Sequence, residues 1–382
     1  MPLPTPFFKR ELFSGIRAVE LYVPGRGNDE VAKEFGLDAA TVLKLASAEN
    51  PLGPSPLALA AMQRALAGAH QYPDMQQQRL RERVAAYNGI DPKNVFAGAG
   101  ETEIMSLIIR TFSTEAQEVL TPLPGFPMYE LYTRALRRRP VHYPLDDAFD
   151  LEVEALLSVA GEESAIVFIT TPNNPTSKTV PRATIEELIE RLPNHAVLVV
   201  DEAYNDYSNQ PPCHDLVRRC ERLIVLRTFS KAFGLAGMRV GYAIADAQAI
   251  DLLRRASNAW NLSTLASAAA IAALDDTEHL RRSIDTVRLS RSRLVEAFAS
   301  HPSFSIVREP EANFILVKSL EPRCTSVALF KALLKLGVIV KDCAVGYRGL
   351  GRYHLRIDVP RPERIDELMG RLDRALAGIP KY

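Results

Sequence analysis

The central part of this chain alternates between short apolar runs and amphipathic helical segments, from about Asn94 to Ile244. The apolar runs are Glu118–Leu120, Ala165–Ile169, Ala196–Val200, Leu223–Leu226 and Val240–Ile244. Short strands that are apolar on both faces and are separated by helices indicate a mostly parallel sheet covered by helices on each side. We therefore predict an α/β fold whose larger part is built on such a sheet.

The remaining segments predict a second, smaller unit and an N-terminal arm. A chain of 382 residues is longer than one hydrophobic core usually serves, so two domains are expected. We predict an irregular arm over residues 1–50 that packs with the small domain, a large domain over 51–275 and a small α+β domain over 276–382. The helices and strands expected in the small domain are Asp276–Ala299, Asn313–Val317, Val327–Leu336, Val338–Val340, Tyr353–Ile357 and Pro362–Ala377.

Charge and composition argue against several classes of protein. The formal net charge is zero, whereas a protein that binds nucleic acid usually has a basic surplus. No apolar stretch is long enough to span a membrane, and the N-terminus lacks the apolar region of a signal peptide. We therefore expect a cytoplasmic protein that acts on small molecules. No metal site is expected either, because metal-binding and redox spacing is missing from the four cysteines, Cys213, Cys220, Cys324 and Cys343.

Polar residues gather where the predicted strands end. In open α/β sheets, ligands bind at the carboxyl ends of the strands. Each of these polar segments alone has a commoner structural explanation, such as a turn or a helix cap. Their combination at the ends of one sheet predicts a cofactor pocket that also binds an anion. The segments are Gly98–Thr102, Thr170–Thr176, Asp201–Tyr204 and Arg227–Gly234.

This set of residue types suits pyridoxal 5′-phosphate (PLP). The aldehyde of PLP reacts with a lysine amine, which Lys231 offers. Its ring nitrogen stays protonated opposite a carboxylate, and Asp201 suits that position. Asn174 and Tyr204 are the expected hydrogen-bond donors to the ring oxygen, and Phe126 is the expected neighbour of the ring face.

The phosphate group of this cofactor needs a separate anion site. Backbone N–H groups at a helix N-terminus bind phosphate, and hydroxyl groups and a cation complete such a site. The residues expected to form it are Gly100, Glu101 and Thr102 at the start of a helix, together with Thr228, Ser230 and Arg239.

Longer motifs resemble a known family. The segment from Ser230 to Tyr242, SKAFGLAGMRVGY, is similar to the motif around the Schiff-base lysine of fold-type I PLP aminotransferases. More narrowly, the chain resembles the histidinol-phosphate aminotransferases over nearly its whole length. That resemblance implies the fold-type I architecture, PLP as cofactor, a homodimer and a role in histidine biosynthesis. The segments that carry it are Tyr22–Gly25, Lys44–Pro56, Tyr72–Asp74, Pro172–Thr176, Asp201–Tyr204, Ala312–Phe314 and Leu355–Ile357.

The resemblance also implies roles for single residues. Lys231, Asp201 and Tyr204 would be catalytic, with Lys231 as the Schiff-base lysine and the proton carrier. Arg356 would hold the carboxylate of glutamate, a task that suits the planar guanidinium group. Histidinol phosphate has no α-carboxylate, so its phosphate needs another anchor. Tyr22 and Tyr72 would be the candidates, with Tyr72 reaching in from the neighbouring subunit. The substrate-binding residues implied are Tyr22, Asn50, Tyr72, Lys341 and Arg356.

Several positions depart from the family pattern. Ala48 stands where the family usually has asparagine, Ser177 where it has glycine and Lys341 where it has arginine. Glu101 would bring a carboxylate close to the expected phosphate. Other PLP reactions therefore stay open: transamination of aromatic or other amino acids, decarboxylation of threonine phosphate, or β-elimination by a C–S lyase. A PLP-binding regulatory protein is a further class, but it would usually carry a DNA-binding module, for which we expect no room.

Overall fold

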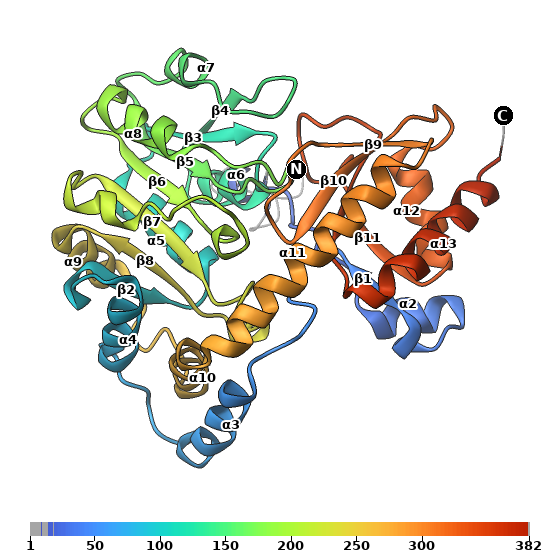
Figure 1. Cartoon of the computed structure of the whole chain (residues 1–382). Coiled ribbons are helices and arrows are strands. Elements are labelled where there is room, and N and C mark those ends of the chain that lie inside the picture. Colours follow the sequence, from blue (N-terminus) through green and yellow to red (C-terminus); the bar gives the residue numbers. More distant parts are fainter. Residues whose placement is uncertain (1–8, 10–13, 18, 381–382) are drawn as a thin grey trace, which may run out of the picture.

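The computed structural model describes residues 9, 14–17 and 19–380, and it contains two β-sheets surrounded by helices (Figure 1). The larger sheet has seven strands in the order β2-β8-β7-β6-β5-β3-β4. Neighbouring strands are parallel except at β8, which runs antiparallel to both β2 and β7. The predicted α/β fold with a mostly parallel sheet is confirmed. The strands are β2 (Val95–Gly98), β3 (Glu118–Leu123), β4 (Arg139–Pro144), β5 (Ser164–Thr170), β6 (Val197–Asp201), β7 (Leu223–Thr228) and β8 (Gly241–Ala245).

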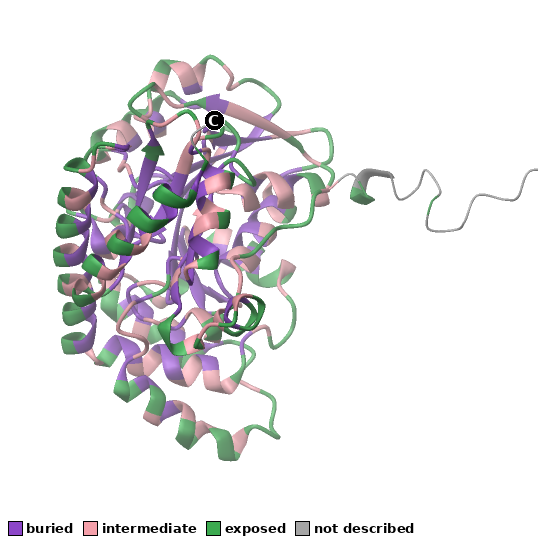
Figure 2. Ribbon diagram, turned by 90° about the vertical axis from the view of Figure 1, so that its right-hand side faces the viewer, coloured by how far each residue is buried: buried purple, intermediate pink, exposed green. Residues whose placement is uncertain are grey.

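The central strands are apolar over most of their length because both faces of the sheet are buried (Figure 2). In β5, Val167 and Ile169 belong to the hydrophobic core on one face, and Ile166 and Phe168 to the core on the other. Side chains of a strand alternate between faces, so a strand buried twice needs apolar residues at every position. The helices that contribute to these two cores include α4 (Gln78–Asn88), α8 (Arg182–Arg191) and α10 (Thr264–Asp275) on the first face, and α5 (Glu101–Phe112) and α9 (Ala247–Ala256) on the second.

The smaller sheet has five strands in the order β1-β11-β12-β10-β9. Its first strand comes from the N-terminal arm and runs parallel to β11, with Leu43 opposite Val338. The long helix α11 (Thr277–Ala299) contacts α10 at one end and β10 and α13 along the rest, so it links the two sheets. The elements of this unit are β1 (Leu43–Leu45), β9 (Phe304–Ile306), β10 (Phe314–Ser319), β11 (Val338–Asp342), β12 (His354–Asp358), α12 (Ser326–Lys335) and α13 (Ile365–Gly378).

The prediction of an irregular arm over residues 1–50 is wrong for its second half. That half contains α2 (Asn28–Phe35) as well as β1. Val31 and Ala32 of α2 share a small core with Leu334 and Ile339, which ties the arm to the C-terminal unit. The domain boundary expected near residue 276 stays a prediction, although Asp276 lies between α10 and α11 there. The remaining helices are α1 (Ser14–Arg17), α3 (Pro56–Ala65), α6 (Pro127–Ala135) and α7 (Val153–Leu157).

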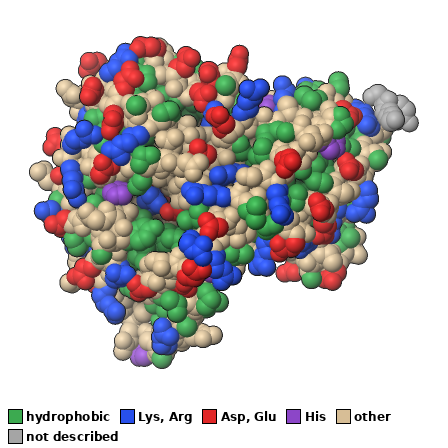
Figure 3. Space-filling view, viewed as in Figure 1, with side chains coloured by type: hydrophobic (Ala, Val, Ile, Leu, Met, Phe, Trp, Pro, Cys, Tyr) green, Lys and Arg blue, Asp and Glu red, His purple; other side chains and the backbone are tan. Residues whose placement is uncertain are grey.

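In the described part of the chain, neither the surface charge nor the cysteines indicate a binding site other than the carboxyl ends of the large-sheet strands. Figure 3 shows Lys, Arg, Asp and Glu side chains mixed over the visible face. Among the described residues, no helix has both the length and the apolar character needed to cross a membrane, and no group of acids, histidines and cysteines could hold a metal ion. All four cysteines are buried as free thiols.

Candidate active site

The carboxyl ends of the large-sheet strands face a cavity of about 410 Å³. Cavities of this size hold small ligands. Residues of the arm and of the small sheet line its other side, so the cavity lies between the two sheets. The predicted site residues that line it are Tyr22, Glu101, Thr102, Phe126, Asn174, Asp201, Tyr204, Thr228, Ser230, Lys231, Arg239, Lys341 and Arg356.

Lys231 lies on the loop that follows β7. Its Nζ donates a hydrogen bond to the Ser47 carbonyl oxygen at 3.1 Å and lies 5.3 Å from the centre of the Tyr204 ring. Burial, followed by the charge of Arg356, lowers the pKa of Lys231 to about 8. A useful fraction of the amine is therefore neutral near neutral pH, and a neutral amine can attack a carbonyl carbon or accept a proton.

Asp201 ends β6, the strand next to β7, and is buried. Its Oδ2 accepts a hydrogen bond from Tyr129 Oη at 2.5 Å, and its Oδ1 accepts one from the Ala203 N–H at 3.0 Å. Burial raises the pKa of Asp201, while these donors act to lower it. Tyr129 was not predicted, although it follows Phe126 by one turn of α6. An acid held in this way can face a protonated ring nitrogen.

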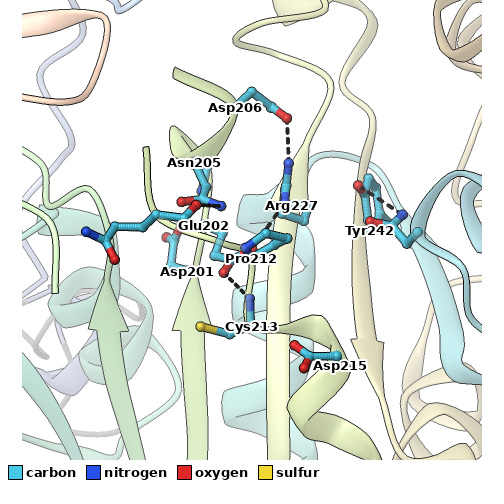
Figure 4. A network of polar contacts seen from close by, with 12 residues as sticks. Asp201, Glu202, Asn205, Asp206, Pro212, Cys213, Asp215, Arg227 and Tyr242 are labelled. Carbon is cyan, nitrogen blue, oxygen red and sulfur yellow. Dashed lines mark hydrogen bonds and ion pairs between the residues drawn. The ribbon is translucent and has the colours of Figure 1, made fainter. Parts of the chain in front are cut away.

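A charged network behind the cavity fixes the ends of β6 and β7 (Figure 4). The Arg227 guanidinium donates to Glu202 Oε2 at 3.2 Å and to Asp206 Oδ1 at 2.5 Å. The other oxygen of Glu202 accepts a hydrogen bond from the Cys213 N–H at 2.7 Å. Because these charges are buried, the loss of one partner leaves the others without compensation. The network therefore holds the strand ends that carry Asp201 in a fixed position.

Asn174 joins the large sheet to the small one. Its Nδ2 lies 3.4 Å from Tyr204 Oη, and its Oδ1 accepts hydrogen bonds from Tyr347 Oη at 2.9 Å and from Arg356 Nη1 at 3.0 Å. Arg356 also donates to the Ala46 carbonyl oxygen at 2.7 Å. Charges and hydroxyl groups around Arg356 raise its pKa above the ordinary value, against the effect of burial, so its guanidinium stays charged. Tyr347 is a second site residue that the sequence did not reveal.

Several groups that favour an anion lie at the start of α5. Gly100, at φ +83°, precedes the helix, and a Cβ atom there would lie 2.4 Å from Arg239 Nη2. Only glycine leaves this space free. The Arg239 guanidinium lies 3.4 Å from both Ser230 Oγ and Thr102 Oγ1. A helix N-terminus, a cation and two hydroxyl groups therefore converge on one point, which fits a phosphate group.

The residues present thus fit PLP as a whole. The anion site suits its phosphate, the Asp201 carboxylate suits its ring nitrogen, and Lys231 suits its aldehyde. Phe126 lines the same cavity and its ring packs edge-on against Tyr129, 5.7 Å between ring centres. A stacking position for Phe126 on the cofactor ring stays a prediction.

The structure does not bring Asn50 or Tyr72 into this cavity. The Asn50 amide donates to the Ala232 carbonyl oxygen at 2.8 Å and to Ser283 Oγ at 3.0 Å. It therefore anchors the loop that carries Lys231. Tyr72 is 80% exposed and stacks on Trp260, with 4.6 Å between ring centres. It is accessible to a neighbouring molecule rather than to the cavity of its own chain.

Tyr22 and Lys341 lie together at the side of the cavity formed by the arm and β11. Lys341 Nζ donates to the Val23 carbonyl oxygen at 2.9 Å and lies 5.4 Å from the centre of the Tyr22 ring. Burial, and then the charge of Arg356, lowers the pKa of Lys341. An ammonium group has three N–H donors, so Lys341 has donors left for an anion.

Comparison with known proteins identifies relatives over nearly the whole chain. A family model described as aminotransferase class I and II matches residues 40–372. Histidinol-phosphate aminotransferase of Methanothermobacter thermautotrophicus is 36% identical over 362 residues, which covers 94% of this chain and 96% of the relative. The enzyme of the same name from Haloferax volcanii is 38% identical and covers 84% and 87% of the two chains. The crystal structure of histidinol-phosphate aminotransferase from Sinorhizobium meliloti in complex with PLP superimposes with a TM-score of 0.85 at 25% identity, covering 95% of this chain and 97% of that one.

Proposed function

This chain belongs to the aminotransferase class I and II family, and from that premise we propose that it transfers the amino group of L-histidinol phosphate to 2-oxoglutarate. The products are imidazole-acetol phosphate and glutamate. The enzyme is a PLP-dependent aminotransferase with a fold-type I architecture. The substrate is the proposed part.

The observation that carries the proposal is a second cationic region in the cavity. The anion site at α5 suits the phosphate of the cofactor. Arg356 and Lys341 lie on the opposite lining, contributed by the small sheet, with Tyr22 beside Lys341. A substrate with a phosphate of its own, alternating with a dicarboxylate, needs cations of this kind.

We propose the following roles for the residues that hold the cofactor. Bound PLP supplies an electrophilic carbon and a ring that accepts the electron pair left when the Cα–H bond of the substrate breaks. Lys231 holds the cofactor through its amine and then moves the proton at the substrate Cα. Asp201 keeps the proton on the ring nitrogen, while Asn174 and Tyr204 bind the ring oxygen. The anion site is formed by Gly100, Glu101, Thr102, Thr228, Ser230 and Arg239, with Glu101 taking part through its backbone N–H group only.

We also propose that the enzyme is a cytoplasmic homodimer with shared active sites. The exposed Tyr72, supported by Trp260, would add its hydroxyl group to the substrate phosphate of the neighbouring subunit. The four buried free thiols suit a reducing compartment.

The test is turnover of the purified enzyme with L-histidinol phosphate and 2-oxoglutarate. We expect glutamate to form at a rate that exceeds the rate with phenylalanine or tyrosine as amino donor. The Lys231→Ala variant serves as the control for background amine transfer that does not depend on the Lys231 amine. Faster transfer from an aromatic amino acid, release of CO₂ from threonine phosphate, or release of a thiol from a thioether amino acid would each replace the proposed function with the corresponding alternative.

A further inference from the structure

Glu101 is an acid of the cavity whose side chain has no part in the roles above. It is the first residue of α5, lies directly after Gly100 and is only 8% exposed. Its Oε1 atom is buried, and no N–H or hydroxyl group of the described residues donates a hydrogen bond to it. A buried carboxylate oxygen without a donor is unfavourable in its charged form, because burial removes water that would solvate it.

The polar partner of Glu101 is Asp201, another acid that lines the cavity. The Asp201 carboxyl group raises the pKa of Glu101 through its charge and through a side-chain hydrogen bond, and the same hydrogen bond lowers the pKa of Asp201. Two carboxyl groups can share a hydrogen bond only if one of them carries a proton. Asp201 already accepts hydrogen bonds from Tyr129 Oη and the Ala203 N–H, which stabilise its ionised form. The proton therefore belongs on Glu101.

The charged groups that face Glu101 agree with this assignment. The charged groups with the largest effect on its pKa are Asp201, Lys231 and Arg227. Burial raises the pKa of Glu101 well above its ordinary value, and the charge of Asp201 raises it further, while the two cations oppose the shift. Arg227 is already paired with two acids behind the cavity, as Figure 4 shows.

We propose that Glu101 is a positioning residue that acts as a neutral acid, donating a hydrogen bond to Asp201 and keeping a second negative charge away from the anion site. The phosphate of the cofactor binds at the N-terminus of the helix that Glu101 begins. An ionised carboxylate there would repel the phosphate, whereas a neutral acid leaves the backbone N–H groups and Arg239 free to bind it. This inference concerns the cofactor site and does not depend on the identity of the substrate.

Infrared spectroscopy of the cofactor-free enzyme tests the protonation directly. The wild-type protein, labelled with ¹³C-glutamate, should keep the C=O stretching band of a protonated glutamic acid above pH 7, where exposed glutamates are ionised. The band should be missing from Glu101→Gln. No such band in the wild type overturns the proposal, and this result needs no variant to fold.

Titration of the cofactor-free enzyme with PLP over a range of pH tests the consequence. At acidic pH, wild type and Glu101→Gln should bind PLP with Kd values within about twofold, because glutamine is also a neutral donor. Above the pKa of Glu101, the wild-type Kd should rise relative to the variant by about tenfold per pH unit, since binding must return one proton. Lys231 titrates in both proteins, so its effect cancels in the ratio.

A matched control comes from the same helical turn. The Glu103 carboxylate accepts hydrogen bonds from the Ala99 N–H and from the Asn261 amide, so it already has donors. Glu103→Gln should change the Kd for PLP by a factor that does not vary with pH. A Glu101→Gln ratio that is equally constant with pH would contradict the proposal.

Discussion

Removal of the Tyr129 hydroxyl group should slow amine transfer without unfolding the protein. In Tyr129→Phe, Asp201 loses its 2.5 Å donor and keeps only the Ala203 N–H and the Glu101 carboxyl group. A hydrogen bond to a charged acceptor contributes about 1.5–3 kcal/mol. Without it, Asp201 becomes more basic and holds the ring proton less firmly on the nitrogen. If the whole contribution appears in the barrier, the rate falls roughly ten- to hundredfold.

The assay is a stopped-flow measurement of a single amine transfer from glutamate to the enzyme-bound cofactor. Tyr143→Phe is the matched control, because the Tyr143 hydroxyl is equally buried but donates to the Phe168 carbonyl oxygen at 2.7 Å, away from Asp201. Both variants should lose some thermal stability, and only Tyr129→Phe should lose rate. A near-normal rate in Tyr129→Phe with full cofactor, or an equal loss in Tyr143→Phe, would refute the reasoning.

Three further predictions concern other parts of the site. Borohydride reduction of the holoenzyme followed by peptide mapping should place the cofactor on Lys231, and label on another lysine would rule out its role. Arg227→Met should lower the free energy of unfolding by about 3–5 kcal/mol in urea titrations, because Glu202 and Asp206 stay buried without their cation, and an unchanged midpoint would contradict that account. Tyr72→Phe should raise KM for histidinol phosphate roughly tenfold and leave KM for glutamate nearly unchanged; mixing it with Lys231→Ala subunits should restore activity, whereas no gain after confirmed subunit exchange would place Tyr72 in its own subunit.

The parts of the fold that the sequence predicts are those with a strong local signal. The apolar runs of β5, β6 and β7 identify buried strands because both of their faces meet a core. Strands without that pattern were missed. β4 is the edge strand of the large sheet and reads Arg-Pro-Val-His-Tyr-Pro, and β1 and β9 have only three residues each. An edge or a three-residue strand depends on its neighbours more than on its own composition.

The same limit applies to the site. Residues in long motifs, such as Lys231 and Asn174, were predicted and line one cavity. Tyr129 and Tyr347 were missed because their importance comes from partners that the fold supplies, Asp201 in one case and Asn174 in the other. Asn50 lies within a motif but contacts the loop after Lys231, so its place in a motif did not reveal whether it meets a ligand or supports a neighbour.

The pairing of β1 with β11 has a consequence for how the protein is made. Leu43 leaves the ribosome early, but its partner Val338 is synthesised only after most of the chain. Until then, the two leucines of β1 and the apolar face of α2 have no core to join, so the nascent chain exposes a segment that chaperones can bind. The large sheet, whose strands all lie between Val95 and Ala245, can form while the C-terminal part is still being translated. A chain truncated before Val338 would therefore have a formed large sheet and an arm without a partner, which makes the arm accessible to proteases.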